Sequence, residues 1–254
     1  MKRLLILAVF TLSLAELYAL PTRVIVRARA KDAKFIGTSM GGAWVRIRDV
    51  QSQEILAQGS TVGSTGNTSL LMKEAHERYT QISSEGSAKF EVVLDLDEPI
   101  FVDIEVIAPY QKKQARASVR TQVWLIPGKD MAGDGIIMEI PGFVIDALSP
   151  QTHSSVKLAN GQQEIPIKAN IVMMCGCTIS KGGLWDGDQM EVKALVKRNG
   201  KAFKTVDLTL GEQVNTFLGT LVVDQVGSYE IVVYAYDPKT ANTGIDKTFV
   251  NVRN

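Results

Sequence analysis

The sequence predicts an all-β protein of two tandem antiparallel β-sandwich domains, preceded by an export signal. Three observations lead to this prediction: apolar and polar residues alternate with a period of two, turn-forming residues separate the alternating segments, and an apolar run opens the chain. Side chains of a strand point alternately to the two faces of its sheet, so this alternation is typical of strands with one buried face.

Residues 1–19 are predicted to be a cleaved Sec-type signal peptide. Met1-Lys2-Arg3 is basic, residues 4–14 are mostly apolar, and Ala19 offers a small residue at the cleavage point. The apolar run is too short to cross a bilayer as a helix and no later run reaches that length, so we expect no transmembrane span in the mature chain. An uncleaved anchor is the alternative. We therefore expect a periplasmic or extracellular protein, and the short leader is typical of bacteria.

Charge argues against a nucleic-acid partner. The chain has 28 basic and 27 acidic residues, and cleavage after residue 19 would remove Lys2, Arg3 and Glu16 and leave 26 of each. A balanced chain without a basic cluster lacks the positive surface that binds phosphate backbones or anionic lipid. We expect no nucleic acid among its partners.

Residues 21–128 are expected to form the first sandwich. Alternation is clearest in residues 90–96 and 100–106, which the turn Asp97-Glu98-Pro99 joins. The other expected strands are residues 23–30, 43–48 and 119–125, and Trp44 and Trp124 lie on the outward parity of the last two strands. Residues 69–79 have the composition of a short helix inserted between strands, with Thr68 or Ser69 as its cap.

Turn-forming residues interrupt the pattern after residue 126, and we assign residues 129–142 to a linker with a connecting strand at 136–140. The domain boundary is placed at Pro141-Gly142. Residues 143–254 are expected to form the second sandwich, since short strands separated by turn signals are typical of that fold. Its expected strands are residues 143–148, 164–173, 190–196, 206–210, 217–223, 228–236 and 248–252.

Two family resemblances bear on architecture. Residues 24–96 resemble transthyretin-like or carboxypeptidase-regulatory sandwiches, through Gly41-Gly42-Ala43-Trp44-Val45-Arg46-Ile47, Ile55-Leu56-Ala57-Gln58-Gly59 and the Thr65-Gly66 turn. Residues 143–252 are similar to bacterial immunoglobulin-like modules, through Asp224-x-x-Gly227-x-Tyr229-x-Ile231-x-Val233, Ala235-Tyr236-Asp237 and Asn242-Thr243-Gly244. This second resemblance implies that Tyr229 is a tyrosine-corner residue, whose hydroxyl bonds nearby backbone. Ile231 stands where antibody domains have a cysteine, so no inter-sheet disulfide can form, and such folds host many functions.

The two cysteines of the chain lie one residue apart in Met173-Met174-Cys175-Gly176-Cys177. If the strand from Ile165 continues unbroken, Met173, Cys175 and Cys177 share its inward face and both thiols pack in the core. If Gly176 instead folds the chain sharply, the thiols can form a disulfide, which export to an oxidising compartment favours. Such a small ring constrains little of the unfolded chain, so its stabilising effect would be modest.

A soft-metal site is the third hypothesis for this cluster. Two thiolates and the Met173 thioether, joined by Met174 if the strand ends in a turn, form a ligand set suited to Cu(I). The candidate metal ligands are thus Met173, Met174, Cys175 and Cys177, and copper(I) is the one cofactor candidate. The glycine-rich segment 178–188 follows and carries Trp185. It is either a binding loop at a sandwich tip or a solvated connection with Trp185 packed over the sandwich end.

No catalytic residue is assigned. The sequence has no Gly-x-Ser-x-Gly, and no histidine near Cys175 could activate it, so we expect no enzyme. We favour a binding or assembly module of the periplasm or cell surface, which engages a protein partner or envelope component through loops at the sandwich ends. The alternative is a periplasmic Cu(I)-handling or metalloprotein-assembly factor. Thiol redox chemistry is a third class, disfavoured because no thioredoxin-like pattern surrounds the cysteines. Association with a membrane complex is left open.

Overall fold

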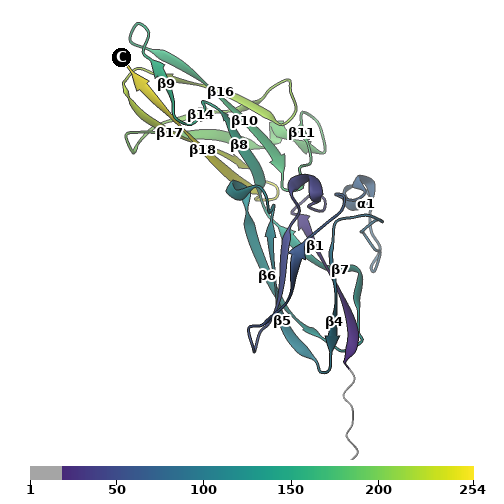
Figure 1. Cartoon of the computed structure of the whole chain (residues 1–254). Helices are drawn as coiled ribbons and strands as arrows, with labels where there is room; N and C mark the ends of the chain where they lie inside the picture. The colour runs from purple at the N-terminus through teal and green to yellow at the C-terminus, as the bar shows by residue number, and fades with distance from the viewer. Residues whose placement is uncertain (1–18) are drawn as a thin grey trace, which may run out of the picture.

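The computed structural model describes residues 19–254, so the predicted signal peptide lies outside the described residues except for Ala19. Within this range no helix has the length and apolar character needed to cross a membrane. Strands dominate, and the helical elements are α1 (Thr68–Met72) and three short 3-10 turns. Figure 1 shows the strands in two groups joined end to end, with the C terminus far from the start of β1.

Residues 20–140 form two sheets, with strand orders β4-β1-β7 and β3-β2-β5-β6. The strands are β1 (Leu20–Ala30), β2 (Trp44–Asp49), β3 (Ile55–Ser60), β4 (Phe90–Leu96), β5 (Ile100–Ala108), β6 (Ala117–Leu125) and β7 (Met131–Ile140). The inward residues of β1, β2 and β5 are fully buried in one core, as Val24, Val45 and Ile104 illustrate, and those of β3, β4 and β6 are mostly partly buried against it. The alternation in the sequence therefore reports which face of each strand is buried.

Within the segment 129–142, the connecting strand predicted at 136–140 is the second half of β7, which begins earlier, at Met131. This strand pairs in parallel with β1, with Ala30 opposite Ile140, and a register shift lies near Val24. At Gly135 the backbone φ is +64°, and a Cβ there would lie 2.3 Å from the Ile25 carbonyl oxygen. The glycines permit an irregular, close approach of two strands rather than a turn. Only Pro141-Gly142 separates β7 from the next strand.

The helix within residues 69–79 is shorter than predicted and has a different cap. The α1 helix ends at Met72, and the Asn67 side chain accepts a hydrogen bond from the Leu70 N–H at 3.1 Å. Leu71 is the buried residue of this helix, whereas residues 73–79 are exposed and non-helical. Without an apolar face to bury, a longer helix gains no packing energy.

Residues 143–253 form two further sheets, with strand orders β15-β16-β10-β8 and β14-β13-β17-β18-β9. The strands are β8 (Phe143–Ser149), β9 (Ser154–Lys157), β10 (Gln163–Met173), β13 (Glu191–Arg198), β14 (Lys201–Asp207), β15 (Thr209–Leu210), β16 (Thr216–Val223), β17 (Gly227–Tyr236) and β18 (Thr243–Arg253). A small parallel ladder joins β11 (Ile179–Ser180) to β12 (Trp185–Asp186). The single strand expected at 206–210 is divided, because the chain passes from one sheet to the other at Leu208.

The all-β fold with antiparallel β-sandwich sheets is confirmed. Tyr229 is fully buried and its hydroxyl donates to the Gln225 carbonyl oxygen at 2.7 Å, as the immunoglobulin-like resemblance implies. The transthyretin-like resemblance of the first group of strands stays a prediction. Buried side chains of both groups form one continuous cluster. The two groups therefore meet in packed contact at a junction, which is the region between β7 and β8.

Candidate functional site

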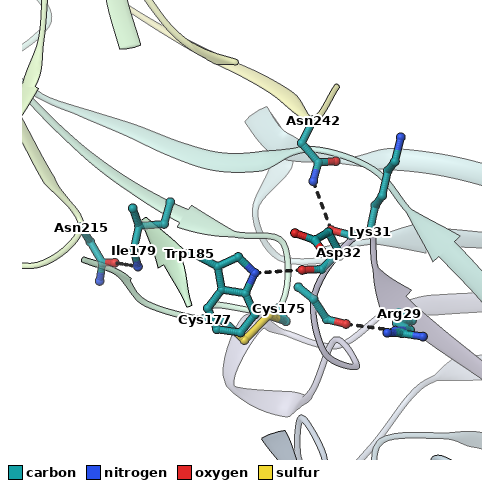
Figure 2. Close-up of a disulfide and its surroundings, with 10 residues drawn as sticks. Arg29, Lys31, Asp32, Cys175, Cys177, Ile179, Trp185, Asn215 and Asn242 are labelled. Atoms are coloured by element: carbon teal, nitrogen blue, oxygen red, sulfur yellow. Dashed lines mark hydrogen bonds between the residues drawn. A yellow bond between two sulfur atoms is a disulfide. The ribbon is translucent and has the colours of Figure 1, made fainter. Parts of the chain in front are cut away.

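Loops from both strand groups meet at the junction, as Figure 2 shows. The Trp185 indole N–H donates to the Asp32 carbonyl oxygen at 2.8 Å, and the Asn242 side-chain amide donates to the Lys31 carbonyl oxygen at 3.1 Å. The Asn242 side-chain oxygen Oδ1 accepts from the Gly142 N–H at 2.8 Å. These contacts fix the loop that follows β1 against the second strand group. Trp185 thus packs over the end of the sandwich, and its partner is backbone of the first group.

The sulfur cluster lies at this junction. Cys175 and Cys177 are joined by a disulfide, with their Cα atoms 5.4 Å apart. The strand β10 ends at Met173, the Gly176 N–H donates to the Met173 carbonyl oxygen at 2.7 Å, and Gly176 has a φ of +79°. The chain therefore turns at Gly176, and the hypothesis of an unbroken strand is wrong. Both cysteines are nevertheless buried, with Cys175 1% and Cys177 8% exposed, but they lie in a turn and not on a continuing strand.

The four candidate metal ligands are close in sequence, but in the disulfide-bonded protein the two cysteines bond each other and the two methionines pack among other residues. Met173 is fully buried, and the Met174 methyl group lies 2.8 Å from where a Cβ of Gly142 would be. Sulfurs bonded to each other provide no thiolate for a soft metal. Within residues 19–254, no three or more His, Cys, Asp or Glu side chains are grouped to hold a metal ion. The copper hypothesis stays a prediction, and it requires the reduced cysteine pair.

An open cleft of about 480 Å³ exposes one side of this junction to solvent. Lys34 and Lys73 line it from the first strand group, and Cys175, Cys177 and Trp185 line it from the second. The other lining residues are Ser39, Thr65, Thr68, Gly176, Thr178 and Leu184, so no carboxylate faces the cleft. Neither lysine belongs to an ion pair among the described residues. The cleft is therefore positively charged, and a disulfide forms part of its wall.

Trp185 separates this cleft from a smaller, acidic one of about 230 Å³, which Asp32, Asp186 and Asp237 line with Lys239. Partial burial raises the pKa of Asp32, and the charge of Asp237 raises it further. Hydrogen bonds from the backbone N–H groups of Gly182 and Asp188 instead lower the pKa of Asp186. The two sides of the tryptophan thus have opposite electrostatic character.

A third cleft, of about 450 Å³, lies at the end of the first strand group remote from the junction, among the turns drawn lowest in Figure 1. Phe101 and Trp124 pair on neighbouring strands with ring centroids 5.0 Å apart, and Trp124 is 57% exposed. Asp49, Asp97 and Glu98 also line this cleft, and no lysine or arginine does. We call it the Trp124 cleft. The Gln51 N–H and the Ser52 hydroxyl hold the pKa of the Asp49 carboxyl below its ordinary value.

The sequence predicted part of these sites. It placed Trp124 on the outward face of its strand, and Trp124 is indeed exposed. Trp44, expected on the same outward face, stacks on Tyr110 with ring centroids 5.3 Å apart. The pairing of Phe101 with Trp124 was missed, because the long connection 109–116 between β5 and β6 does not determine their register from the sequence. Lys34 and Lys73 were missed because nothing local marks two distant lysines as neighbours of the cysteines.

No protein-family model matches this sequence, and no curated protein matches it. Among solved structures, the chain is similar to fibronectin(III)-like modules of Clostridium thermocellum CbhA, at 11% identity over 92% of this chain and 94% of that one, with a TM-score of 0.29. A chimeric titin Z1Z2 is 9% identical over 93% and 98% of the two chains, with a TM-score of 0.26. An engineered protein is 16% identical over a match that covers 48% of this chain and 22% of the engineered one, with a TM-score of 0.30. Similarities at this level do not identify a function.

Proposed function

We propose that this protein is an exported, non-enzymatic binding or assembly module of the periplasm or cell surface, and that it engages a protein partner of the envelope through the Trp124 cleft. The aromatic pair in that cleft, formed by exposed Trp124 and partly buried Phe101, carries the proposal. A large aromatic side chain left more than half exposed beside a concave surface is typical of a contact site, because its burial by a partner gains free energy.

The chemistry of the cleft indicates what the partner presents. Phe101 and Trp124 offer an apolar surface, and Asp97 and Glu98 add negative charge at its border. A complementary partner segment combines an apolar side chain, which packs on Trp124, with lysine or arginine, which pairs with the carboxylates. The cleft also lies at the end of the molecule remote from the junction, so a partner can approach it without disturbing the packed region.

Site-specific photo-crosslinking in an envelope extract tests this proposal. A photoreactive amino acid with an aromatic ring, which keeps an aromatic contact at the position, replaces Trp124 in one variant and Leu195 in another. Leu195 is 45% exposed and lies on β13 in the other strand group. We expect a discrete protein adduct from position 124 and none from position 195. Excess unlabelled wild-type protein should compete this adduct away, and excess Trp124→Ala protein should not.

A second pair of variants tests the charge argument. Excess Asp97→Lys/Glu98→Lys protein should fail to compete the adduct away. Excess Glu212→Lys protein, which carries a single charge reversal at an exposed position outside the cleft, should compete as well as wild type. An adduct that forms equally at positions 124 and 195, or that Trp124→Ala protein competes as well as wild type, would contradict the proposal.

A further inference from the structure

The junction cleft brings together a disulfide and two lysines that no partner in the described chain neutralises. Lys34 lies after β1 and Lys73 directly after α1, so positive charge comes from two separate loops of the first strand group. Cys177 is the more accessible cysteine, at 8% exposure against 1% for Cys175. A small solute that enters the cleft therefore meets positive charge and a sulfur of the disulfide together.

The ring closed by this disulfide is very small, since the cysteines are two residues apart in sequence. A disulfide stabilises a protein mainly by restricting the unfolded chain, and that effect grows with the length of the closed loop. A ring of this size therefore adds little stability, and a structural role alone does not account for it. Packing already holds the turn, because a Cβ on Gly176 would lie 2.5 Å from the Met40 sulfur of the first strand group.

We propose that the junction cleft is a thiol–disulfide exchange site that accepts small anionic thiols. The thiolate of such a compound attacks Cys177 Sγ, and the bond between the two protein sulfurs breaks. Its electron pair leaves on Cys175 Sγ, which takes up a proton from water, and a mixed disulfide remains on Cys177. A second thiol molecule attacks the thiol-derived sulfur of the mixed disulfide and releases the small-molecule disulfide and the Cys177 thiolate. Two thiols are oxidised and one protein disulfide is reduced.

Lys34 and Lys73 select for the charge of the thiol. A concave surface lined by one sign of charge raises the local concentration of ions of the opposite sign. An anionic thiol is thus enriched beside Cys177, whereas a cationic thiol is repelled. This site is separate from the Trp124 cleft, so exchange and partner binding can succeed or fail independently.

Reduction rates with three thiols of different charge test the proposal on the purified folded protein. The first thiol is 2-mercaptoethanesulfonate, whose sulfonate group is anionic. The second is 2-mercaptoethanol, whose hydroxyl group is neutral, and the third is cysteamine, whose ammonium group is cationic. The cysteines freed by reduction are alkylated at intervals and counted by intact-mass measurement. Each rate constant is divided by the thiolate concentration, because the thiols differ in pKa and the thiolate is the attacking form. For wild type we expect the anionic thiol to react on the order of tenfold faster than the cationic one.

Matched lysine variants separate the cleft from general surface charge. Lys34→Gln/Lys73→Gln should abolish the preference for the anionic thiol, whereas Lys181→Gln should keep it. Lys181 is highly exposed, pairs with Asp188 at 3.7 Å and does not line the cleft. Peptide mapping should find the mixed disulfide on Cys177. Equal rates for the three thiols would overturn the proposal, as would cysteines that resist reduction until the protein unfolds.

Discussion

At the scale of single residues, Gly176 combines a backbone conformation that other residues rarely adopt with close packing across the junction. Its φ of +79° lies in the left-handed region, and an added Cβ would meet Met40. Gly182 has a φ of +64° with open space around it. We expect Gly176→Ala to lower the free energy of unfolding by about 2 kcal/mol and Gly182→Ala by about 1 kcal/mol, as urea denaturation would measure.

The difference between these two variants isolates packing against Met40. Met40→Ala in the Gly176→Ala background should remove the collision and reduce the additional loss. If Gly176→Ala and Gly182→Ala are equally stable, the Met40 side chain moves aside without cost and Gly176 is required by its backbone alone.

Residue-scale features were predictable where a local pattern determines them. Exposure of Trp124 follows from strand alternation, and the Tyr229 hydrogen bond follows from a short motif. The partner of Trp185 did not follow, since Asp32 lies 153 residues away in the chain. The sequence also left the disulfide as one of three hypotheses, because only the turn at Gly176 decides among them.

At the scale of strands, Glu105 on β5 lies directly between two arginines of the neighbouring strands. Arg46 on β2 and Arg120 on β6 are its register partners, at 3.6 and 2.8 Å, and the Glu105 side chain is 11% exposed. The hydrogen bond that Arg120 donates to Glu105 is the main reason why the pKa of Glu105 lies below its ordinary value of 4.5. A carboxyl with a lowered pKa stabilises the fold fully above pH 4.5, and this stabilisation is lost as the pH falls below that value.

We therefore expect Glu105→Gln to lower the free energy of unfolding by about 1–2 kcal/mol at pH 7, since Arg120 is largely exposed and solvent weakens the pair. Urea denaturation should show the difference from wild type shrinking as the pH falls below 4.5, because Glu105 becomes protonated first in the unfolded chain and at lower pH in the folded protein. Glu230→Gln, which removes the more exposed pair with Lys197, should cost about 0.5 kcal/mol or less. A difference that persists unchanged in acid would contradict the assignment to charge.

Antiparallel strands were more predictable than parallel pairing. Strand β4 has the predicted bounds, and β8 differs from its prediction by one residue. Only residues 136–140 of β7 were predicted as a strand, because Gly133 and Gly135 signal turns, and its parallel pairing was not predicted, because its partner β1 lies more than 100 residues earlier. Strand β9 was missed for a related reason, since this short segment pairs in parallel with the last strand of the chain. Parallel pairing depends on distant sequence, which local periodicity does not encode.

At the scale of the whole molecule, we propose that residues 20–140 and 143–253 are two domains that unfold together because the junction couples them. Asn242 is fully buried and bonds both the Gly142 N–H and the Lys31 carbonyl oxygen. Asn242→Ala leaves these two backbone groups without their partner, which should cost about 2–3 kcal/mol. This loss of free energy weakens the contact between the two strand groups and leaves the core of each group intact.

Calorimetry distinguishes coupled from independent unfolding. Wild type should unfold in one cooperative transition, and Asn242→Ala should unfold in two, because the weakened junction no longer transmits the stability of one domain to the other. Asn67→Ala removes the cap of α1 within the first strand group and serves as the control: it should lower the single transition temperature without dividing the transition. Two transitions in wild type would mean that packed contact at the junction contributes too little free energy to couple the domains, even though their buried side chains form a continuous cluster.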